Sequence, residues 1–416
     1  MSSSAQFTFG GGLDALGTGQ LSTAPYVSDG YFGRETQIWK QSWLTVGRVA
    51  DLERAGDYIA FDLGVVHASI VVVRGDDQRL RAFHNVCSHR AGRILCSTAQ
   101  GRAKFLTCPF HGWTFSLEGK LLSVPKKEIF KNLPDKQSLG LSEIAVEVWG
   151  GFIFVNLAPR PDESLQQYLR GLPPGLDAYL SEKPWTWYTG YRKTFRANWK
   201  DLMNIQHEGY HASFLHGETL AVDFAPADCA NTVFPDSSGA VSLLTVSRPQ
   251  FRGDPFAKMT TIQKLSMQHG RTSNWVESDT SVASRSFPGA VNHRNSDRWV
   301  FDCYTIFPNL LLFVGTAVLS VMRTWPISAH EAIWEWDWFF DHEVSKFGEL
   351  FNREHGRIAT RNALAEDWGI IELIHENMRS GAFAGTNIAQ DMEATVRAFH
   401  EKLTARVPLE EAGAGA

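Results

Sequence analysis

The chain has 416 residues and a formal net charge of −5. This length allows a large buried core and predicts two domains. The slightly acidic balance argues against a nucleic-acid-binding face. The sequence contains no run of eighteen apolar residues, so we expect no membrane span. The first residues lack the basic and apolar regions of a signal peptide, and the five cysteines do not suggest a disulfide framework, so we expect a cytoplasmic protein.

The first 158 residues divide into two regions. Residues 1–44 predict an N-terminal arm followed by a helix that packs on a later domain, because apolar and charged side chains recur at helical spacing from Tyr31 to Trp43. Residues 45–158 change to short β-branched and aromatic runs such as Val71–Val73 and Phe152–Val155, bounded by turn residues. They predict a small all-β domain.

Two Cys–His pairs lie in this β region: Cys87 with His89, then Cys108 with His111. A Rieske-type [2Fe-2S] cluster needs two thiolates on one iron and two imidazoles on the other, which these pairs supply. A structural zinc ion is the alternative, although C-x-H and C-x-x-H are not the usual zinc-finger spacings. Gly112, which follows the second pair, suits a tight loop, and the motif therefore predicts a cluster that carries electrons.

Residues 159–408 predict a larger second domain, and residues 409–416 a disordered tail. The second domain has a helical stretch at about 198–216 near its start and two helices near its end, at about 344–380 and 388–404. Between them, alternating apolar runs predict strands of one antiparallel sheet, at residues 298–306, 310–314, 319–325 and 332–340.

Three histidines and one acid fall within the stretch 207–216. His207, Glu208 and His211 match H-E-x-x-H, the zinc-protease helix, in which Glu208 would be the general base. Alternatively, His211 and His216 are two ligands of a non-haem ferrous site that a distant carboxylate completes. Peptide hydrolysis needs no electrons, whereas oxygen activation at ferrous iron does, so the cluster motif favours iron.

The third ligand must come from elsewhere in the chain. The acids Glu366, Asp367 and Glu372 lie together on a predicted helix. Their chemistry alone does not distinguish one from another, and an isolated acidic pair is more often a solvated helix face.

Together these residues resemble the catalytic α subunit of the Rieske non-haem iron aromatic-ring-hydroxylating oxygenases, over about residues 30–405. The resemblance implies an α+β fold, with a small all-β Rieske domain and a larger catalytic domain whose curved antiparallel sheet is flanked by helices (helix-grip, START-like). The matching residues are Cys87, His89, Cys108, His111, Gly112, Trp113, Asn198, Trp199, Lys200, Glu208, Tyr210, His211, His216, Glu366 and Asp367.

The resemblance also implies roles. Cys87, His89, Cys108 and His111 would hold the [2Fe-2S] cluster, and the mononuclear Fe(II) ligands would be His211, His216 and Asp367. Glu208 would link the two centres by accepting hydrogen bonds from His111 of one chain and His211 of another. Asn204 lies where the family often has a Glu-Asn pair before the acid at the position of Glu208, and we count Asn204 as a catalytic residue. His207 is an additional imidazole that we expect not to bind metal.

The implied reaction uses O₂ and electrons from NAD(P)H, delivered by a separate reductase directly or through a ferredoxin. The implied assembly is a homotrimer, with or without a small β subunit. We expect an aromatic or other apolar organic substrate and rank cis-dihydroxylation first; the alternative is monooxygenation, either C–H hydroxylation or oxidative N- or O-demethylation. Four apolar residues are candidates to face the iron: Phe214, Phe307, Leu311 and Phe313.

Overall fold

The computed structural model describes residues 7–96, 100–217, 219–220, 223–249, 260–269 and 280–410. The chain forms two units: residues 36–166 make one, and residues 1–35 together with 167–416 make the other. Most of the predicted tail lies beyond residue 410, outside the described residues. Among the helices that are described, none is long and apolar enough to cross a bilayer.

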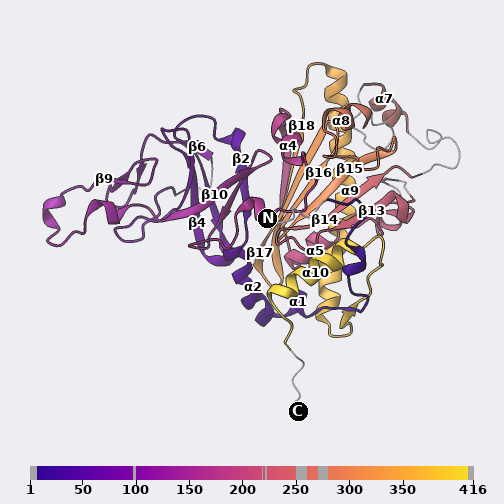
Figure 1. Ribbon diagram of the computed structural model, residues 1–416, viewed down its shortest axis with the longest axis horizontal. Coiled ribbons are helices and arrows are strands. Elements are labelled where there is room, and N and C mark those ends of the chain that lie inside the picture. The colour runs from indigo at the N-terminus through magenta and orange to yellow at the C-terminus, as the bar shows by residue number, and fades with distance from the viewer. Residues whose placement is uncertain are drawn as a thin grey trace, which may run out of the picture. The chain divides into compact units, whose positions relative to one another are not determined.

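The unit of residues 36–166 is built from antiparallel strands (Figure 1). Seven strands form one sheet in the order β2-β11-β10-β5-β4-β3-β6, and β7-β8-β9 form a second, small sheet. The predicted runs Val71–Val73 and Phe152–Val155 lie in β4 and β11 and are fully buried. The strands are β2 Leu44–Arg48, β3 Asp57–Leu63, β4 Ala68–Arg74, β5 Leu80–His84, β6 Gln100–Arg102, β7 Leu106–Thr107, β8 Thr114–Phe115, β9 Leu121–Ser123, β10 Glu143–Trp149 and β11 Phe152–Asn156.

The larger unit contains a seven-stranded antiparallel sheet in the order β12-β18-β17-β16-β15-β14-β13. All four strands that the sequence predicted are present, and the structure adds β12, β13 and β14. The strands are β12 Thr186–Phe195, β13 Cys229–Val233, β14 Ala240–Ser247, β15 Trp299–Ile306, β16 Leu310–Val314, β17 Val318–Ser328 and β18 Glu331–Phe340.

Strand β18 shows why this sheet has two different faces. Trp334, Trp336 and Trp338 are buried and alternate with Glu335 and Asp337, the period of two that a strand requires. Glu335 and Asp337 form ion pairs with arginines of the neighbouring strands on the opposite face. The tryptophan face is therefore the face available for a cavity.

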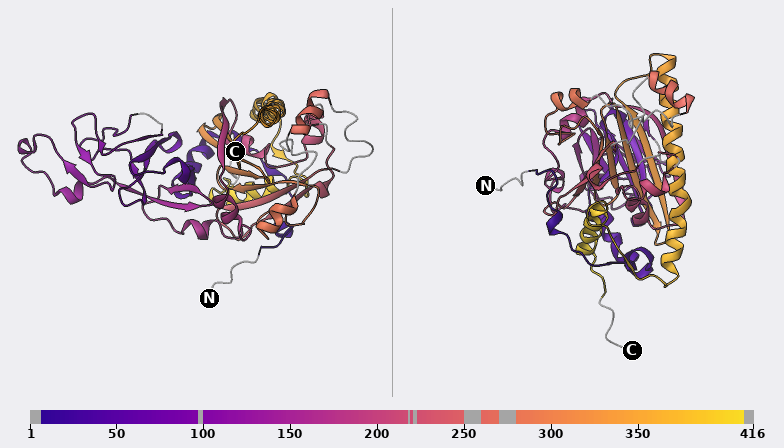
Figure 2. Two further views of the ribbon diagram at one scale, coloured as in Figure 1. Left: turned by 90° about the horizontal axis from the view of Figure 1, so that it is seen from above. Right: turned by 90° about the vertical axis from the view of Figure 1, so that its right-hand side faces the viewer.

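Helices cover this sheet, and the long helix α9 runs along one face of it (Figure 2). The predicted terminal helices are confirmed as α9 Phe347–Arg379 and α10 Ala394–Arg406. A two-stranded ladder, β1 Leu21–Ser22 with β19 Gly385–Thr386, ties the N-terminal arm to this unit. The remaining helices are α1 Ala24–Val27, α2 Asp29–Gln41, α3 Leu165–Tyr168, α4 Leu176–Glu182, α5 Trp199–Asn204, α6 Ala212–Leu215, α7 Thr261–His269 and α8 Thr280–Ser286.

The helical stretch predicted over 198–216 is helical only in part. The segment forms two short helices, α5 and α6, separated by turns over 205–211. Gly209 allows the turning chain to approach β13, because a Cβ at this position would meet Cys229 Sγ at 2.5 Å. His207 and His211 consequently do not share a helix face, which removes the structural basis of the zinc-protease interpretation.

Candidate functional site

Helix α5 is anchored by the Asn198-Trp199-Lys200 motif. Asn198 caps the helix by accepting a hydrogen bond from the Lys200 backbone nitrogen at 3.1 Å, and Asp201 accepts one from the Asn198 backbone in return. Lys200 forms a fully buried ion pair with Glu35 at 2.7 Å. Burial lowers the pKa of Lys200, and the adjacent Glu35 carboxylate opposes this shift. The motif therefore positions the segment that follows it.

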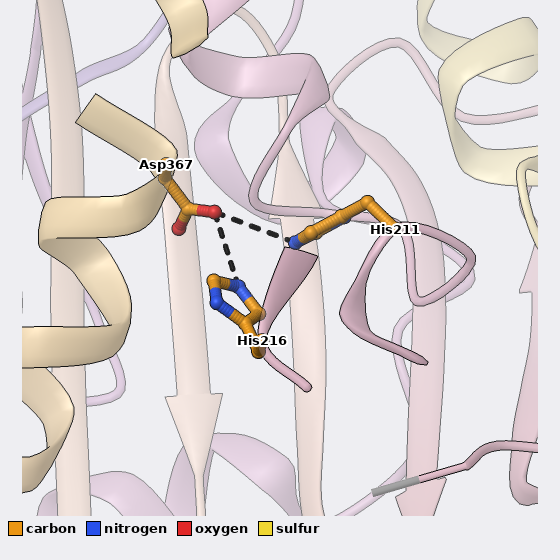
Figure 3. A group of neighbouring side chains, drawn as sticks. All are labelled: His211, His216 and Asp367. Atoms are coloured by element: carbon orange, nitrogen blue, oxygen red, sulfur yellow. Dashed lines mark ion pairs between the residues drawn. The ribbon is translucent and has the colours of Figure 1, made fainter. Parts of the chain in front are cut away.

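Three side chains from two distant segments of the chain meet just beyond α5 (Figure 3). Oδ1 of Asp367, on α9, lies 3.1 Å from His216 Nε2 and 3.5 Å from His211 Nε2. One ligand atom from each residue lies within 4.8 Å of the others, and His216 and Asp367 are buried. Two imidazoles and one carboxylate suit a non-haem ferrous ion with open coordination positions.

Each of these three residues has a second polar partner. Glu208 contacts His211 Nδ1, Glu366 contacts His216 Nδ1 at 2.7 Å, and Gln206 donates to Asp367 Oδ2 at 2.6 Å. Burial lowers the pKa of His216, but Asp367 and Glu366 more than offset this and hold it above its ordinary value. An acceptor at Nδ1 fixes the proton there and leaves Nε2 free for a metal, so the partners suit metal binding.

A cavity of about 200 Å³ opens next to the three residues, between α9 and the tryptophan face of the sheet. The strand register explains its wall, because Trp336 faces Met322 across β17–β18, and Ser320 lies between Trp338 and Phe313. Of the four apolar candidates only Phe313 lines this cavity, while Phe214 is 75% exposed. The wall is largely apolar and aromatic.

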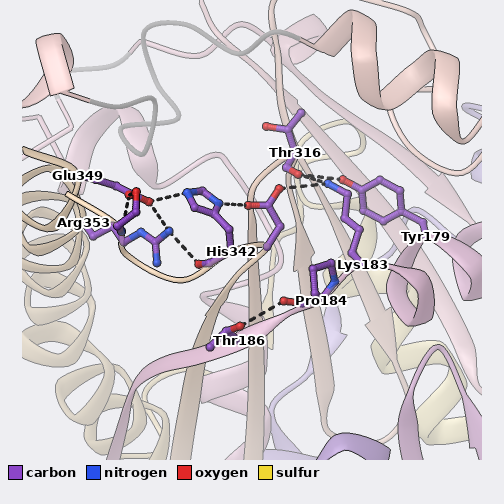
Figure 4. Close-up of polar contacts among 10 residues, drawn as sticks. Tyr179, Lys183, Pro184, Thr186, Thr316, His342, Glu349 and Arg353 are labelled. Atoms are coloured by element: carbon purple, nitrogen blue, oxygen red, sulfur yellow. Dashed lines mark hydrogen bonds and ion pairs between the residues drawn. The ribbon is translucent and has the colours of Figure 1, made fainter.

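The β16–β17 turn is held by polar contacts (Figure 4). Tyr179 donates to the Gly315 carbonyl at 2.5 Å, and Lys183 binds the Thr316 carbonyl. Gly315 also lines the cavity, so these contacts fix part of its wall. The network continues into the start of α9 through Asp341, His342, Glu349 and Arg353.

In the other unit, both Cys–His loops fold back on themselves in the same way. The Cys87 nitrogen donates to the Gly92 carbonyl, and the Cys108 nitrogen to the Trp113 carbonyl, each at 2.8 Å. Gly112 has a φ of 72°, the left-handed conformation that favours glycine. The loops are therefore short and closed, the first following β5 of the seven-stranded sheet and the second joining β7 to β8 of the small sheet.

These loops bring like residues together. Cys87 and Cys108 belong to the same buried core cluster, and burial together with the neighbouring Cys108 thiol raises the pKa of Cys87. The rings of His89 and His111 have centroids 4.7 Å apart, and His89 stacks on Trp113. A thiol pair beside an imidazole pair is the donor set that a Rieske [2Fe-2S] cluster uses.

The structure also distinguishes the residues that the sequence left uncertain. Asp367 joins the histidines, Glu366 contacts His216 from behind, and Glu372 binds Arg196 instead. Asn204 donates to the Tyr26 hydroxyl at 2.8 Å and lines a different cavity. His207 is fully buried near Phe399 and is not part of the group.

Gln206 and Glu366 are the partners that sequence reasoning missed. Glu366 had a signal, since it precedes Asp367 in the matching motif, but only as a rival ligand. No sequence signal pointed to Gln206, because its contact with α9 depends on how the turns after α5 fold.

Comparison with known proteins agrees with this arrangement. Residues 176–409 match the model of the ring hydroxylating alpha subunit catalytic domain, and residues 42–134 that of the Rieske [2Fe-2S] domain. The glycine betaine monooxygenase oxygenase subunit of Pseudomonas aeruginosa is 26% identical over 344 residues, 78% of this chain and 77% of that protein. The carnitine monooxygenase oxygenase subunit of Escherichia coli K12 is 34% identical over 198 residues, 46% of this chain and 50% of that protein.

Solved structures show the same fold. The quaternary ammonium Rieske monooxygenase CntA superposes with a TM-score of 0.71 at 21% identity, covering 93% of this chain and 95% of that one. Naphthalene 1,2-dioxygenase superposes with a TM-score of 0.70 at 19% identity, covering 96% of this chain and 93% of that one. The chain therefore belongs to the ring-hydroxylating alpha subunits, the oxygenase components that combine a Rieske [2Fe-2S] domain with a non-haem iron catalytic domain.

Proposed function

We propose that this protein is the terminal component of a Rieske monooxygenase that hydroxylates a C–H bond of a small organic substrate, including oxidative demethylation. The observation that carries the proposal is the group His211, His216 and Asp367 at the wall of an aromatic cavity. The relatives over most of the chain are named as glycine betaine and carnitine monooxygenases, so they favour this alternative over the cis-dihydroxylation ranked first from the sequence.

In this proposal His211, His216 and Asp367 hold Fe(II), and Cys87, His89, Cys108 and His111 hold the cluster. The bound iron supplies oxygen activation at positions that the three side chains leave open. Monooxygenation consumes O₂, two electrons and two protons for each C–H bond that becomes C–OH, and releases one water. Glu208 and Glu366 would keep each imidazole proton on Nδ1.

The cavity wall suggests a substrate class. Trp336 and Trp338 lie with ring centroids 5.4 Å apart, and such rings attract a quaternary ammonium group through cation–π interaction. Near the iron, Glu208, Glu366 and Asp367 add negative charge that also favours a cation. We therefore include quaternary ammonium compounds as the first substrate class to test.

Cis-dihydroxylation of an aromatic ring is the second candidate. Apolar residues such as Leu244, Val246 and Phe301 line the cavity as well, and a planar ring fits such a wall. The large oxygenase component of naphthalene 1,2-dioxygenase from Pseudomonas aeruginosa is 32% identical over 206 residues, 45% of this chain and 42% of that protein.

Electrons would come from NAD(P)H through a separate reductase, with or without a ferredoxin.

The working assembly would be a homotrimer in which the cluster of one copy serves the iron of a neighbouring copy. Exposed apolar side chains support docking between copies. Phe110 beside the cluster loop is 59% exposed, and Tyr210 and Phe214 near Glu208 are 49% and 75% exposed. We also propose that residues 45–158 form the Rieske domain and residues 159–408 the catalytic domain. Sedimentation analysis tests the trimer.

The reaction is tested by oxygen uptake with chemically reduced protein and a panel of quaternary amines, aromatic acids and aromatic hydrocarbons. Labelled ¹⁸O₂ then separates the two candidates, because a monooxygenase places one labelled atom in its product and a dioxygenase places two. Product carrying one label from a quaternary amine supports the proposal. A doubly labelled ring diol would support the second candidate, and no uptake with any class would contradict both.

A further inference from the structure

The two oxygens of Asp367 have different surroundings. Oδ1 points toward the two imidazoles, and the other oxygen faces away from them (Figure 3). Oδ1 is buried and, apart from its ion-pair contacts with these imidazoles, has no hydrogen-bond partner within the described part of the chain, so it is the oxygen available to a ligand shared with the two histidines. Oδ2 accepts the hydrogen bond from Gln206 at 2.6 Å.

The direction of this hydrogen bond follows from its chemistry. An ionised carboxylate only accepts hydrogen bonds, so the nitrogen of the Gln206 amide must face Asp367. A bond of 2.6 Å to a charged acceptor is short and strong. Gln206 lies in the turns between α5 and α6 and also lines the cavity, so it reaches α9 from the segment that carries His211.

We propose that Gln206 is a positioning residue that restricts Asp367 to binding iron through Oδ1 alone. The inference rests on the proposed function, in which Asp367 is an iron ligand. In a site with about six coordination positions, two imidazoles and one oxygen leave about three open, whereas a carboxylate bound through both oxygens leaves about two. Gln206 thus keeps an additional position available at the cavity.

Removing the amide should release Oδ2. Methionine has nearly the length of glutamine but no N–H donor, so Gln206→Met leaves an oxygen of the buried Asp367 carboxylate without its partner. Such an oxygen is costly unless it finds a new positive partner, and the bound cation is the nearest one. Gln20→Met is the control, because Gln20 is exposed in the same unit and contacts Asn387.

The test counts the waters that remain on the ferrous iron of the full-length protein after nitric oxide binds, by pulsed EPR in ¹⁷O-labelled water with the cluster oxidised. Wild type and Gln20→Met should retain about two waters and Gln206→Met about one, a roughly twofold loss of the water signal. Equal signals in wild type and Gln206→Met would overturn the role of Gln206 and leave the proposed function standing.

Two further outcomes are decisive. If Gln206→Met fails to hold iron, the number of waters on the wild-type iron tests the proposal. A single water on the wild-type iron would overturn it, because Asp367 would then already bind through both oxygens. If wild type gives no nitrosyl signal in iron-supplemented protein, the iron assignment fails, and with it both the proposed function and this inference.

Discussion

The two candidate cofactor sites are assembled in different ways. The cluster residues come from two hairpin loops within residues 87–113, each closed by its own backbone hydrogen bonds. The mononuclear site joins His216 to an α9 carboxylate pair about 150 positions later, and its second partners come from the turns after α5 and from α9 itself. Local motifs thus describe the first site almost completely, whereas the second depends on how α9 lies on the sheet.

The strongest test of this comparison is Asp367→Ala. Removing the carboxylate should abolish mononuclear iron binding and reduce turnover to background, because two imidazoles alone hold ferrous iron poorly. The cluster should keep its visible spectrum and its EPR signal after reduction, since its residues lie in the other unit. Loss of both metal centres would mean that the two sites are not independent.

Glu208→Gln should have the next largest effect. The amide keeps the size of the side chain but removes the negative charge from His211 Nδ1, so we expect turnover to fall by about a hundredfold. Iron analysis should still find both centres, and stopped-flow spectra should show slower oxidation of the cluster. Turnover within a factor of two of wild type would contradict the assignment of Glu208.

Glu366→Gln tests the partner that the motif alone did not reveal. It weakens the contact to His216 Nδ1, and we expect about a tenfold loss of Fe(II) affinity, measured by chelator competition. Glu372→Gln is the matched control on the same helix, because Glu372 pairs with Arg196. Equal affinity in both variants would show that Glu366 does not support the iron site.

His207→Leu should have the smallest effect on function and should leave the mononuclear iron content unchanged. Burial lowers the pKa of His207 to about 3, so below pH 6.5 the unfolded chain binds a proton that the folded protein does not. Stability is therefore lost as pH falls from 6.5 toward 3, by up to about 1.4 kcal/mol per pH unit.

Urea unfolding at pH 6, 5 and 4 checks this prediction. Replacing His207 should flatten the pH dependence of the unfolding free energy by about one proton relative to wild type. An unchanged slope would show that His207 is protonated in the folded protein, and loss of iron from this variant would show that it is a ligand after all.

Much of the fold followed from local patterns. The strands around Val71–Val73 and Phe152–Val155 and the helix α9 were predictable, because strand and helix periodicities are properties of neighbouring residues. The segment 198–216 was predictable only in part, because a helical stretch was expected while the turn at Gly209 depends on space beside Cys229.

The amino-acid sequence by itself determined which candidate ligands are present: two Cys–His pairs suited to a cluster, followed by two histidines and an acid suited to iron. The tertiary structure decided which acid meets the histidines, which side chains hold them from behind and which strands form the cavity wall. The reason is physical, since residue types are local, whereas a contact between positions 206 or 216 and α9 exists only after the helix has packed on the sheet.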